Sequence, residues 1–136
     1  ALLIPTAAFA QRNAPADAPF VFEHSYWISP GQTERFVELF NRNKLPLLRR
    51  EMSEGRILWM RMTRPRLRSA DPAQSDFRLT IAWRDAAAAW DDFDPARFVA
   101  HLFPDAERHA REEQQREELV LRRSDLPVQE VTITRE

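Results

Sequence analysis

Residues 20–31 read FVFEHSYWISPG, a run of aromatic and β-branched residues that ends in a Ser-Pro-Gly turn. Such side chains pack well on a pleated, half-buried surface, and Pro-Gly is a strong turn signal. The run therefore predicts a strand over Phe20–Ile28. Successive side chains of a strand point to opposite faces, so His24 shares a face with Tyr26, while Trp27 lies on the other face.

The residues that follow this strand have the pattern of a helix with one apolar side. From Gln32 to about Glu54 the apolar residues recur at helical spacing. The residues of this stripe are Phe36, Val37, Leu39, Phe40, Leu47 and Leu48. Pro46 lacks a backbone N–H and crowds the preceding turn, so we expect it to kink or divide the helix. Gly55 is expected to end it.

Two further strands are expected after this helix. Ile57–Thr63 places Leu58, Met60 and Met62 on one face and Ile57, Trp59 and Arg61 on the other. Asp76–Trp83 alternates cleanly, with Arg78 and Thr80 on its more polar face. The connection Arg64–Ser75 is too long for a tight hairpin.

The C-terminal third predicts helices and then a last strand. Asp85 is an expected N-cap for a short helix over Ala86–Trp90. Asp94-Pro95 suits the start of a second main helix, which Pro104 interrupts and which continues to Leu121. Leu126-Pro127 breaks that helix, and Val128–Thr134 (VQEVTIT) predicts the final strand.

The resulting order, β-α-β-β-α-β, predicts an α+β fold of the ferredoxin-like type. In that arrangement a four-stranded antiparallel sheet carries both helices on one face. The other face is mixed, with Trp59, Arg61 and Arg78 among its residues. A sheet face of this kind usually borders a ligand cavity or another subunit. Two such faces packed together would enclose a barrel, so we expect a homodimer.

Length and charge limit the function classes. A chain of 136 residues supports one domain with tails, and the net charge of −1 provides no overall field for nucleic acid. With two glycines there is no phosphate-cradling loop, and no serine sits in a G-x-S-x-G elbow. The chain contains no cysteine, so it has neither a thiol nucleophile nor a disulfide.

The first ten residues, ALLIPTAAFA, are typical of the end of a secretory signal. They are apolar, they end in small residues, and a Pro/Ala-rich stretch follows. We therefore expect a signal remnant and linker over 1–19, a single domain over 20–136, and a periplasmic or secreted protein. An ordered apolar arm that packs on a partner subunit is the alternative. No other stretch is long enough to cross a bilayer.

The run from His24 to Gly31, with Tyr26 ahead of the Pro-Gly turn, resembles the opening of NIPSNAP-like domains. The resemblance continues in Leu45-Pro46-Leu47 and in Trp83-Arg84-Asp85 before an alanine-rich turn of helix. It implies the dimeric α/β-barrel superfamily, which includes cofactor-independent oxygenases, isomerases and haem-binding enzymes as well as members with no assigned chemistry. None of these motifs is catalytic, so the resemblance implies fold and dimerisation more than activity.

The candidate ligand contacts are His24, Tyr26, Trp59, Arg61 and Arg78. A histidine on a strand beside a cavity could act as a general base or ligate a haem iron. His24 also lies on the more apolar face of its strand, where it would be a hydrogen-bonded structural residue beneath the helices. We expect no cofactor and no metal, because His101 and His109 are about 12 Å apart along a helix.

Three functional hypotheses remain open from the sequence. The first is a dimer that binds a small apolar ligand between its sheets. The second is a cofactor-independent monooxygenase or isomerase that uses His24 as its base. The third is an interaction module, in which the positive edge formed by Arg56, Arg61, Arg64, Arg66 and Arg68 docks a partner. A solvated loop is the alternative reading of that edge.

Overall fold

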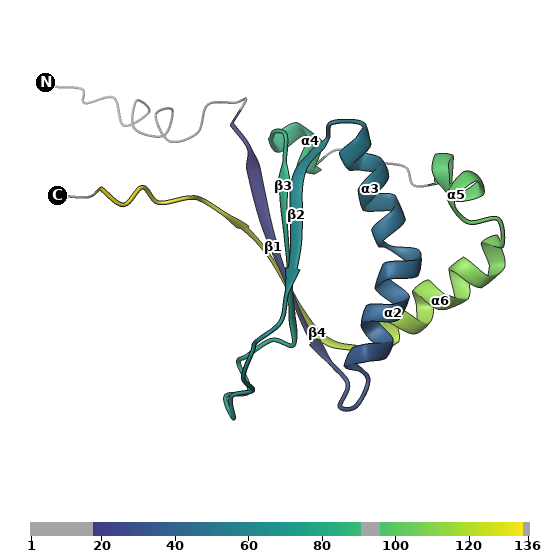
Figure 1. The fold of residues 1–136 in the computed structure, drawn as a ribbon, viewed down its shortest axis with the longest axis horizontal. Coiled ribbons are helices and arrows are strands. Elements are labelled where there is room, and N and C mark those ends of the chain that lie inside the picture. Colours follow the sequence, from purple (N-terminus) through teal and green to yellow (C-terminus); the bar gives the residue numbers. More distant parts are fainter. Residues whose placement is uncertain (1–17, 91–95, 135–136) are drawn as a thin grey trace, which may run out of the picture.

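The structure is a computed structural model that describes residues 18–90 and 96–134. The predicted signal segment and the Asp94-Pro95 helix start lie outside these residues. Figure 1 shows the elements in chain order. They are β1 (Phe20–Ile28), α2 (Thr33–Asn43), α3 (Leu45–Ser53), β2 (Ile57–Thr63), β3 (Phe77–Trp83), α4 (Ala86–Trp90), α5 (Ala96–Leu102), α6 (Ala106–Glu118) and β4 (Val120–Val128).

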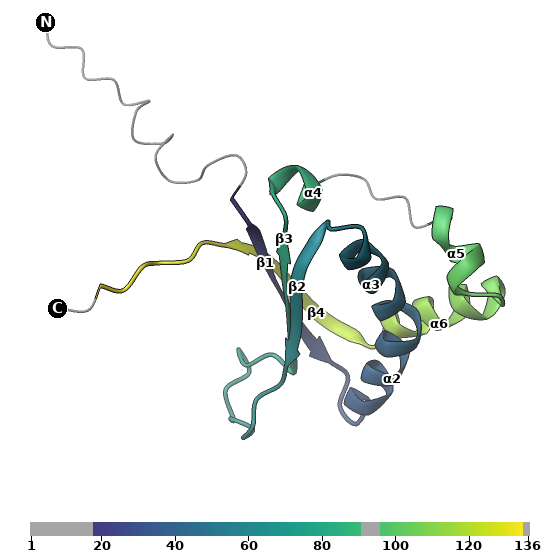
Figure 2. The same ribbon diagram turned by 45° about the horizontal axis from the view of Figure 1, so that its top comes forward.

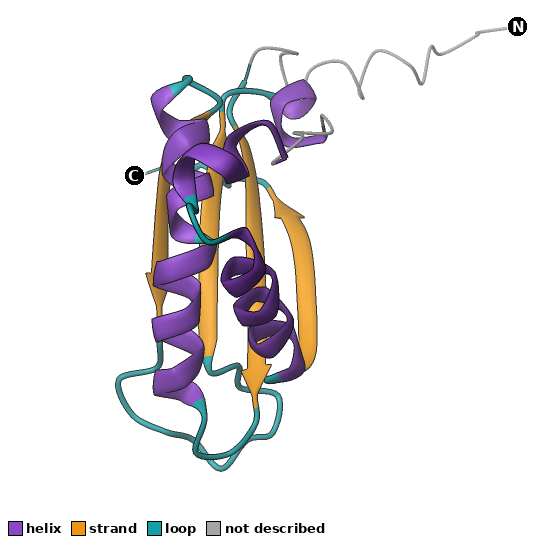
Figure 3. Cartoon of the chain, turned by 90° about the vertical axis from the view of Figure 1, so that its right-hand side faces the viewer, coloured by secondary structure: helices purple, strands orange, loops and turns teal. Residues whose placement is uncertain are grey.

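The strands form one four-stranded sheet in the order β2-β3-β1-β4, with every neighbouring pair antiparallel. Helices α2, α3 and α6 lie on one side of this sheet (Figure 1), and Figure 3 looks at the sheet through that helix layer. The predicted ferredoxin-like α+β fold is confirmed. We call the side without the main helices the open face.

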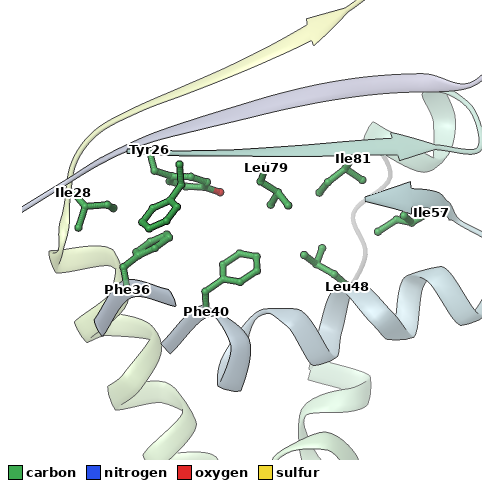
Figure 4. Packing of buried hydrophobic residues seen from close by; sticks show 9 residues of the cluster. Tyr26, Ile28, Phe36, Phe40, Leu48, Ile57, Leu79 and Ile81 are labelled. Atoms are coloured by element: carbon green, nitrogen blue, oxygen red, sulfur yellow. The ribbon is translucent and has the colours of Figure 1, made fainter. Parts of the chain in front are cut away.

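The core lies between the sheet and helices α2 and α3. Tyr26 and Ile28 of β1 point toward Phe36 and Phe40 of α2, and Leu48 of α3 completes this part of the cluster (Figure 4). Phe36 is fully buried, and its ring stands 5.4 Å from that of Tyr26. The apolar stripe that the sequence predicted for the helix therefore forms the core.

The helix after β1 is divided where Pro46 predicted a break. Helix α2 ends at Asn43, and α3 begins at Leu45 with the proline in its first turn. Proline is tolerated there because first-turn N–H groups have no partner inside the helix. Gly55 follows α3 with φ +76°, a left-handed conformation that glycine adopts without a steric penalty.

The prediction of the last strand was wrong. The strand β4 is Val120–Val128, and the preceding helix ends at Glu118 rather than at Leu121. Of the predicted strand Val128–Thr134, Val128 belongs to β4, while residues 129–134 are not in a strand and run away from the helices (Figure 1 and Figure 2). β4 is an edge strand with mostly exposed residues, so it lacks the apolar alternation that marks a buried strand.

The predicted faces of the second strand were also partly wrong. The register of β2 against β3 shifts between Ile57 and Trp59. Ile57 is 2% exposed and belongs to the core, whereas Trp59 lies opposite Ala82 on the open face. A bulge of this kind adds a residue to one strand, so side chains two positions apart no longer share a face.

Helix α6 is joined to α2 mainly by polar contacts. Arg42 of α2 and Arg108 of α6 both pair with the buried carboxylate of Glu112. The Asn43 side-chain amide donates a hydrogen bond to the backbone carbonyl of Leu39, and its Oδ1 atom lies 3.0 Å from His109 Nδ1. The contact between α6 and α2 therefore includes buried ion pairs and hydrogen bonds, whereas α2 itself packs on β1 through the apolar core.

We expect Leu48→Ala to lower the free energy of unfolding by about 2–5 kcal/mol, because it leaves a cavity in the core. Leu67→Ala makes the same chemical change at a loop position where the side chain is 82% exposed. That variant should change stability by less than about 0.5 kcal/mol. Urea unfolding of both variants measures the difference, and equal losses would contradict this placement of the core.

Candidate functional site

The structure divides the five predicted ligand contacts between the two faces of the sheet. Trp59, Arg61 and Arg78 come together on the open face. His24 and Tyr26 lie on the helix side, in line with the core residues of β1. His24 therefore does not face the space that a second sheet would cover.

The open-face residues have a defined arrangement across strands β2 and β3. Thr63 lies directly opposite Arg78, and Arg61 lies opposite Thr80. Arg61 is thus a diagonal neighbour of Arg78, a spacing that long side chains can bridge. The Arg61 guanidinium stands 5.3 Å from the Trp59 ring centre. Thr80 and Ala82 are 5% and 0% exposed, so larger neighbouring side chains cover the centre of the face.

Arg122 belongs to the same face and was missed from the sequence. It pairs in register with Trp27, and its guanidinium stands 4.4 Å from the Trp27 ring centre. The alternation of β1 had placed Trp27 on this side. Arg122 lay between the predicted end of the helix and the predicted last strand, so no pattern assigned it a face. Among the described residues the Trp27 indole N–H is buried without a hydrogen-bond partner.

The open-face arginines differ from those of the neighbouring loop in their ion pairing. Within the described ranges, Arg61, Arg78 and Arg122 have no carboxylate oxygen within 4.0 Å. Arg64, in contrast, pairs with Glu34 at 2.8 Å. Arg56 pairs with Glu51 and Arg68 with Asp76. The positive edge predicted from the sequence is therefore largely neutralised in the loop and left unpaired on the sheet.

A pocket of about 360 Å³ opens where the long β2–β3 loop meets the open face. Its lining contains two arginines, two hydroxyl side chains and no acidic residue. The lining residues are Thr63, Arg64, Pro65, Ala73, Gln74, Ser75 and Arg78. A second pocket of about 190 Å³ beside the same loop includes both Arg68 and the carboxylates of Asp71 and Asp76. The first pocket thus presents the unpaired charge of Arg78, while its other arginine, Arg64, is paired with Glu34.

On the helix side, His24 and Tyr26 belong to a polar network with β4. The His24 Nδ1 atom lies 2.6 Å from Asp125 Oδ1, and the His24 ring stacks on Phe22. Arg123 reaches Asp125 at 3.6 Å and the Tyr26 hydroxyl at 3.5 Å. The sequence could not reveal Arg123 and Asp125 as partners, because it placed the last strand after them.

Burial shifts the pKa values of two side chains in or near this network. It raises the pKa of Tyr26, and the positive charge of Arg123 opposes the increase. Burial also lowers the pKa of Lys44, the chain's one lysine, and the nearby Arg116 lowers it further. Both effects indicate that this part of the helix–sheet interface is poorly hydrated.

The other two histidines lie on separate helices, His101 on α5 and His109 on α6. The His109 ring stacks on Phe103 at 3.8 Å, so it has a packing role. In the described part of the chain, no group of three or more His, Cys, Asp or Glu residues is arranged to hold a metal ion. None of the helices in those ranges is long and apolar enough to span a membrane.

No protein-family model matches the sequence, and no curated protein matches it. Solved structures do resemble the fold. A dimeric ferredoxin-like protein from an uncultured marine organism has a TM-score of 0.54 at 10% identity, over 89% of this chain and 97% of that chain. A NIPSNAP family protein from Agrobacterium tumefaciens has a TM-score of 0.51 at 12% identity, over 89% of this chain and 93% of that chain. The fold is ferredoxin-like.

A third structure, an uncharacterized NIPSNAP-like domain protein from Burkholderia xenovorans, has a TM-score of 0.50 at 16% identity. It covers 88% of this chain and 91% of that chain. The resemblance to NIPSNAP-like domains is therefore confirmed at the level of the fold. At these identities the similarity concerns architecture and does not extend to activity.

Tyr26 is the single tyrosine of the chain, so ultraviolet absorbance of tyrosinate reports it directly. We expect its titration midpoint in the folded protein to lie above the ~10 of free tyrosine, because burial disfavours the charged form. Arg123→Met should raise the midpoint further. Arg122→Met, the adjacent arginine on the opposite face, is the control and should leave it unchanged.

Because the folded-state pKa is raised, the stability linked to Tyr26 is fully present below pH ~10. It is lost as the pH rises through the folded-state value. A midpoint equal to that of the urea-unfolded chain would contradict the buried position of the hydroxyl.

Proposed function

We propose that the chain forms a homodimer whose open faces meet and hold a small, largely apolar ligand between the two sheets. The observation that carries this proposal is the composition of the open face. Trp59, Leu126 and Val128 remain 44%, 57% and 38% exposed there. Large apolar side chains gathered on one face of a sheet favour a covering partner.

A second copy of the chain suits this face. An isologous contact places the same surface on both subunits, so one apolar face can cover the other. The segment after β4 adds apolar surface, since Val131 and Ile133 are 80% and 89% exposed at alternate positions. One protein of similar fold is described as dimeric, which supports the proposal.

The centre of the face favours a ligand between the sheets. Ser25, Thr80 and Ala82 are short side chains on the two central strands, β1 and β3. Trp27 and Trp59 are the large side chains nearer the ends and the edge. Larger neighbouring side chains cover Thr80 and Ala82 in the single chain, so a ligand over the middle of the sheet would take the place of those larger side chains above the short ones.

Sedimentation velocity tests the dimer. We expect the wild-type chain to sediment as a dimer and Leu126→Glu to shift it toward monomer, because a carboxylate would be buried without a partner. Leu67→Glu introduces the same charge in the exposed β2–β3 loop and should remain dimeric. The neutral fluorophore N-phenyl-1-naphthylamine should bind the wild type and bind Trp59→Ala more weakly. A wild-type monomer that does not bind the fluorophore would refute the proposal.

A second candidate function, proton abstraction by His24, is favoured by the 2.6 Å contact with Asp125. If Asp125 accepts the Nδ1–H hydrogen bond, the neutral ring presents Nε2 as the proton acceptor. The His24 side chain is 21% exposed, so its ring is partly accessible. This base would act on the helix side of the sheet and not in the inter-sheet space for which the isomerase or cofactor-independent oxygenase hypothesis was made.

The eliminative ring opening of 5-nitrobenzisoxazole, which needs only a base and releases a coloured phenolate, tests this second function. We expect the wild type to accelerate it above buffer and His24→Gln to lower that rate at least about tenfold. Asp125→Asn should lower it too, by changing the orientation of the ring. His101→Gln removes an exposed histidine of α5 as the control. Equal rates for His24→Gln and His101→Gln would exclude His24 as the base.

A further inference from the structure

We propose that the ligand of the open face is an organic carboxylate, and that the pocket beside Arg78 receives its charged group. We take the open face as the ligand-binding surface, so this ligand class rests on the function proposed above. The proposal adds a chemical identity for the polar end of the ligand and a position for it at one end of the sheet.

The pocket supplies donors suited to an oxyanion. Arg78 has no carboxylate partner among the described residues, and its planar guanidinium can donate two parallel hydrogen bonds to a carboxylate. Thr63 lies directly opposite Arg78 in the register, and Ser75 lines the same pocket. Their hydroxyl groups can donate to the same oxygens. No acidic residue lines the pocket to compete for these donors.

Size and surroundings favour an organic anion over an inorganic ion. The volume of about 360 Å³ lies within the range of about 300–1,000 Å³ that small-molecule sites occupy. Pro65 and Ala73 give the pocket apolar walls. Arg61 is the diagonal neighbour of Arg78, and beyond it lies the half-exposed ring of Trp59. An aromatic body could extend from the pocket along this line of the sheet.

Charge also links the ligand to the dimer. If a second sheet covered the open face, Arg61 and Arg78 would lose water, and no carboxylate oxygen of the described chain lies within 4.0 Å of them. Glu23, which lies opposite Thr80 on the same face, is a single carboxylate and can offset only part of their charge. Leaving such charges buried and unpaired is costly. A bound carboxylate pairs with Arg78 and reduces that cost. The carboxylate should therefore strengthen the dimer, and a neutral ligand of the same shape should do so less.

Calorimetric titration with 2-naphthoate and its neutral amide, 2-naphthamide, separates charge from shape. We expect 2-naphthoate to bind the wild type at least about tenfold more tightly than the amide, as for a hydrogen-bonded charge pair. Arg78→Met keeps the aliphatic stem and should remove this preference, while Arg78→Lys should retain part of it. Added sodium chloride should weaken naphthoate binding. Sedimentation with and without naphthoate measures the effect on the dimer.

Arg49→Met is the matched control, because Arg49 is an exposed arginine on helix α3, on the other side of the sheet. It should bind naphthoate as the wild type does. Equal binding of naphthoate and naphthamide would overturn the carboxylate assignment and leave the ligand-binding dimer intact. If Arg78→Met still bound naphthoate more tightly than naphthamide, the assignment of the carboxylate to the pocket beside Arg78 would be wrong. If inorganic phosphate bound as tightly as 2-naphthoate, the inference that the ligand has an organic, aromatic part would be wrong. A monomer that binds neither compound would refute the proposed function itself.

Discussion

The pairing of β1 with strands on both sides is the constraint on which the rest of the molecule depends. β1 is hydrogen-bonded to β3 along one edge and to β4 along the other. Its side chains can therefore only alternate between the helix layer and the open face. Tyr26 then packs against Phe36, and Trp27, one residue later, lies under Arg122. A shift of one residue would place Trp27 in the core and Tyr26 on the open face.

The sequence was sufficient for segments with a regular buried face or a strong local signal, but not for the faces of β2, where a bulge interrupts the alternation. β3 could be predicted because Phe77, Leu79 and Ile81 all point into the core. The division of the first helix followed from Pro46, whose missing N–H acts locally. The short helix α4 could likewise be predicted, since the Asp85 side chain accepts a hydrogen bond from the backbone N–H of Ala88. These features depend on neighbours in the chain or on one buried face.

The last strand could not be predicted, because its strand character comes from its partner. Val120–Val128 contains charged residues at adjacent positions and Pro127 near its end. An edge strand tolerates both, since one of its sides faces solvent. The segment 129–134 has the better strand pattern but does not form a strand. As a consequence, two residues beside the predicted His24 and Tyr26, Arg123 and Asp125, were left without an assigned position.

The two faces of the sheet differ in whether their charged side chains have ion-pair partners, and this difference separates the candidate functions. On the helix side the charged groups of β4 are matched, with Arg123 between Glu117 and Asp125 and Asp125 against His24. Matched groups near a core hold a fixed geometry, which is what a base needs for its orientation. On the open face Arg61, Arg78 and Arg122 lack such partners in the described chain. Unmatched guanidinium groups beside exposed apolar surface are suited to a partner from outside the chain, because binding then supplies the missing charge and the missing cover together.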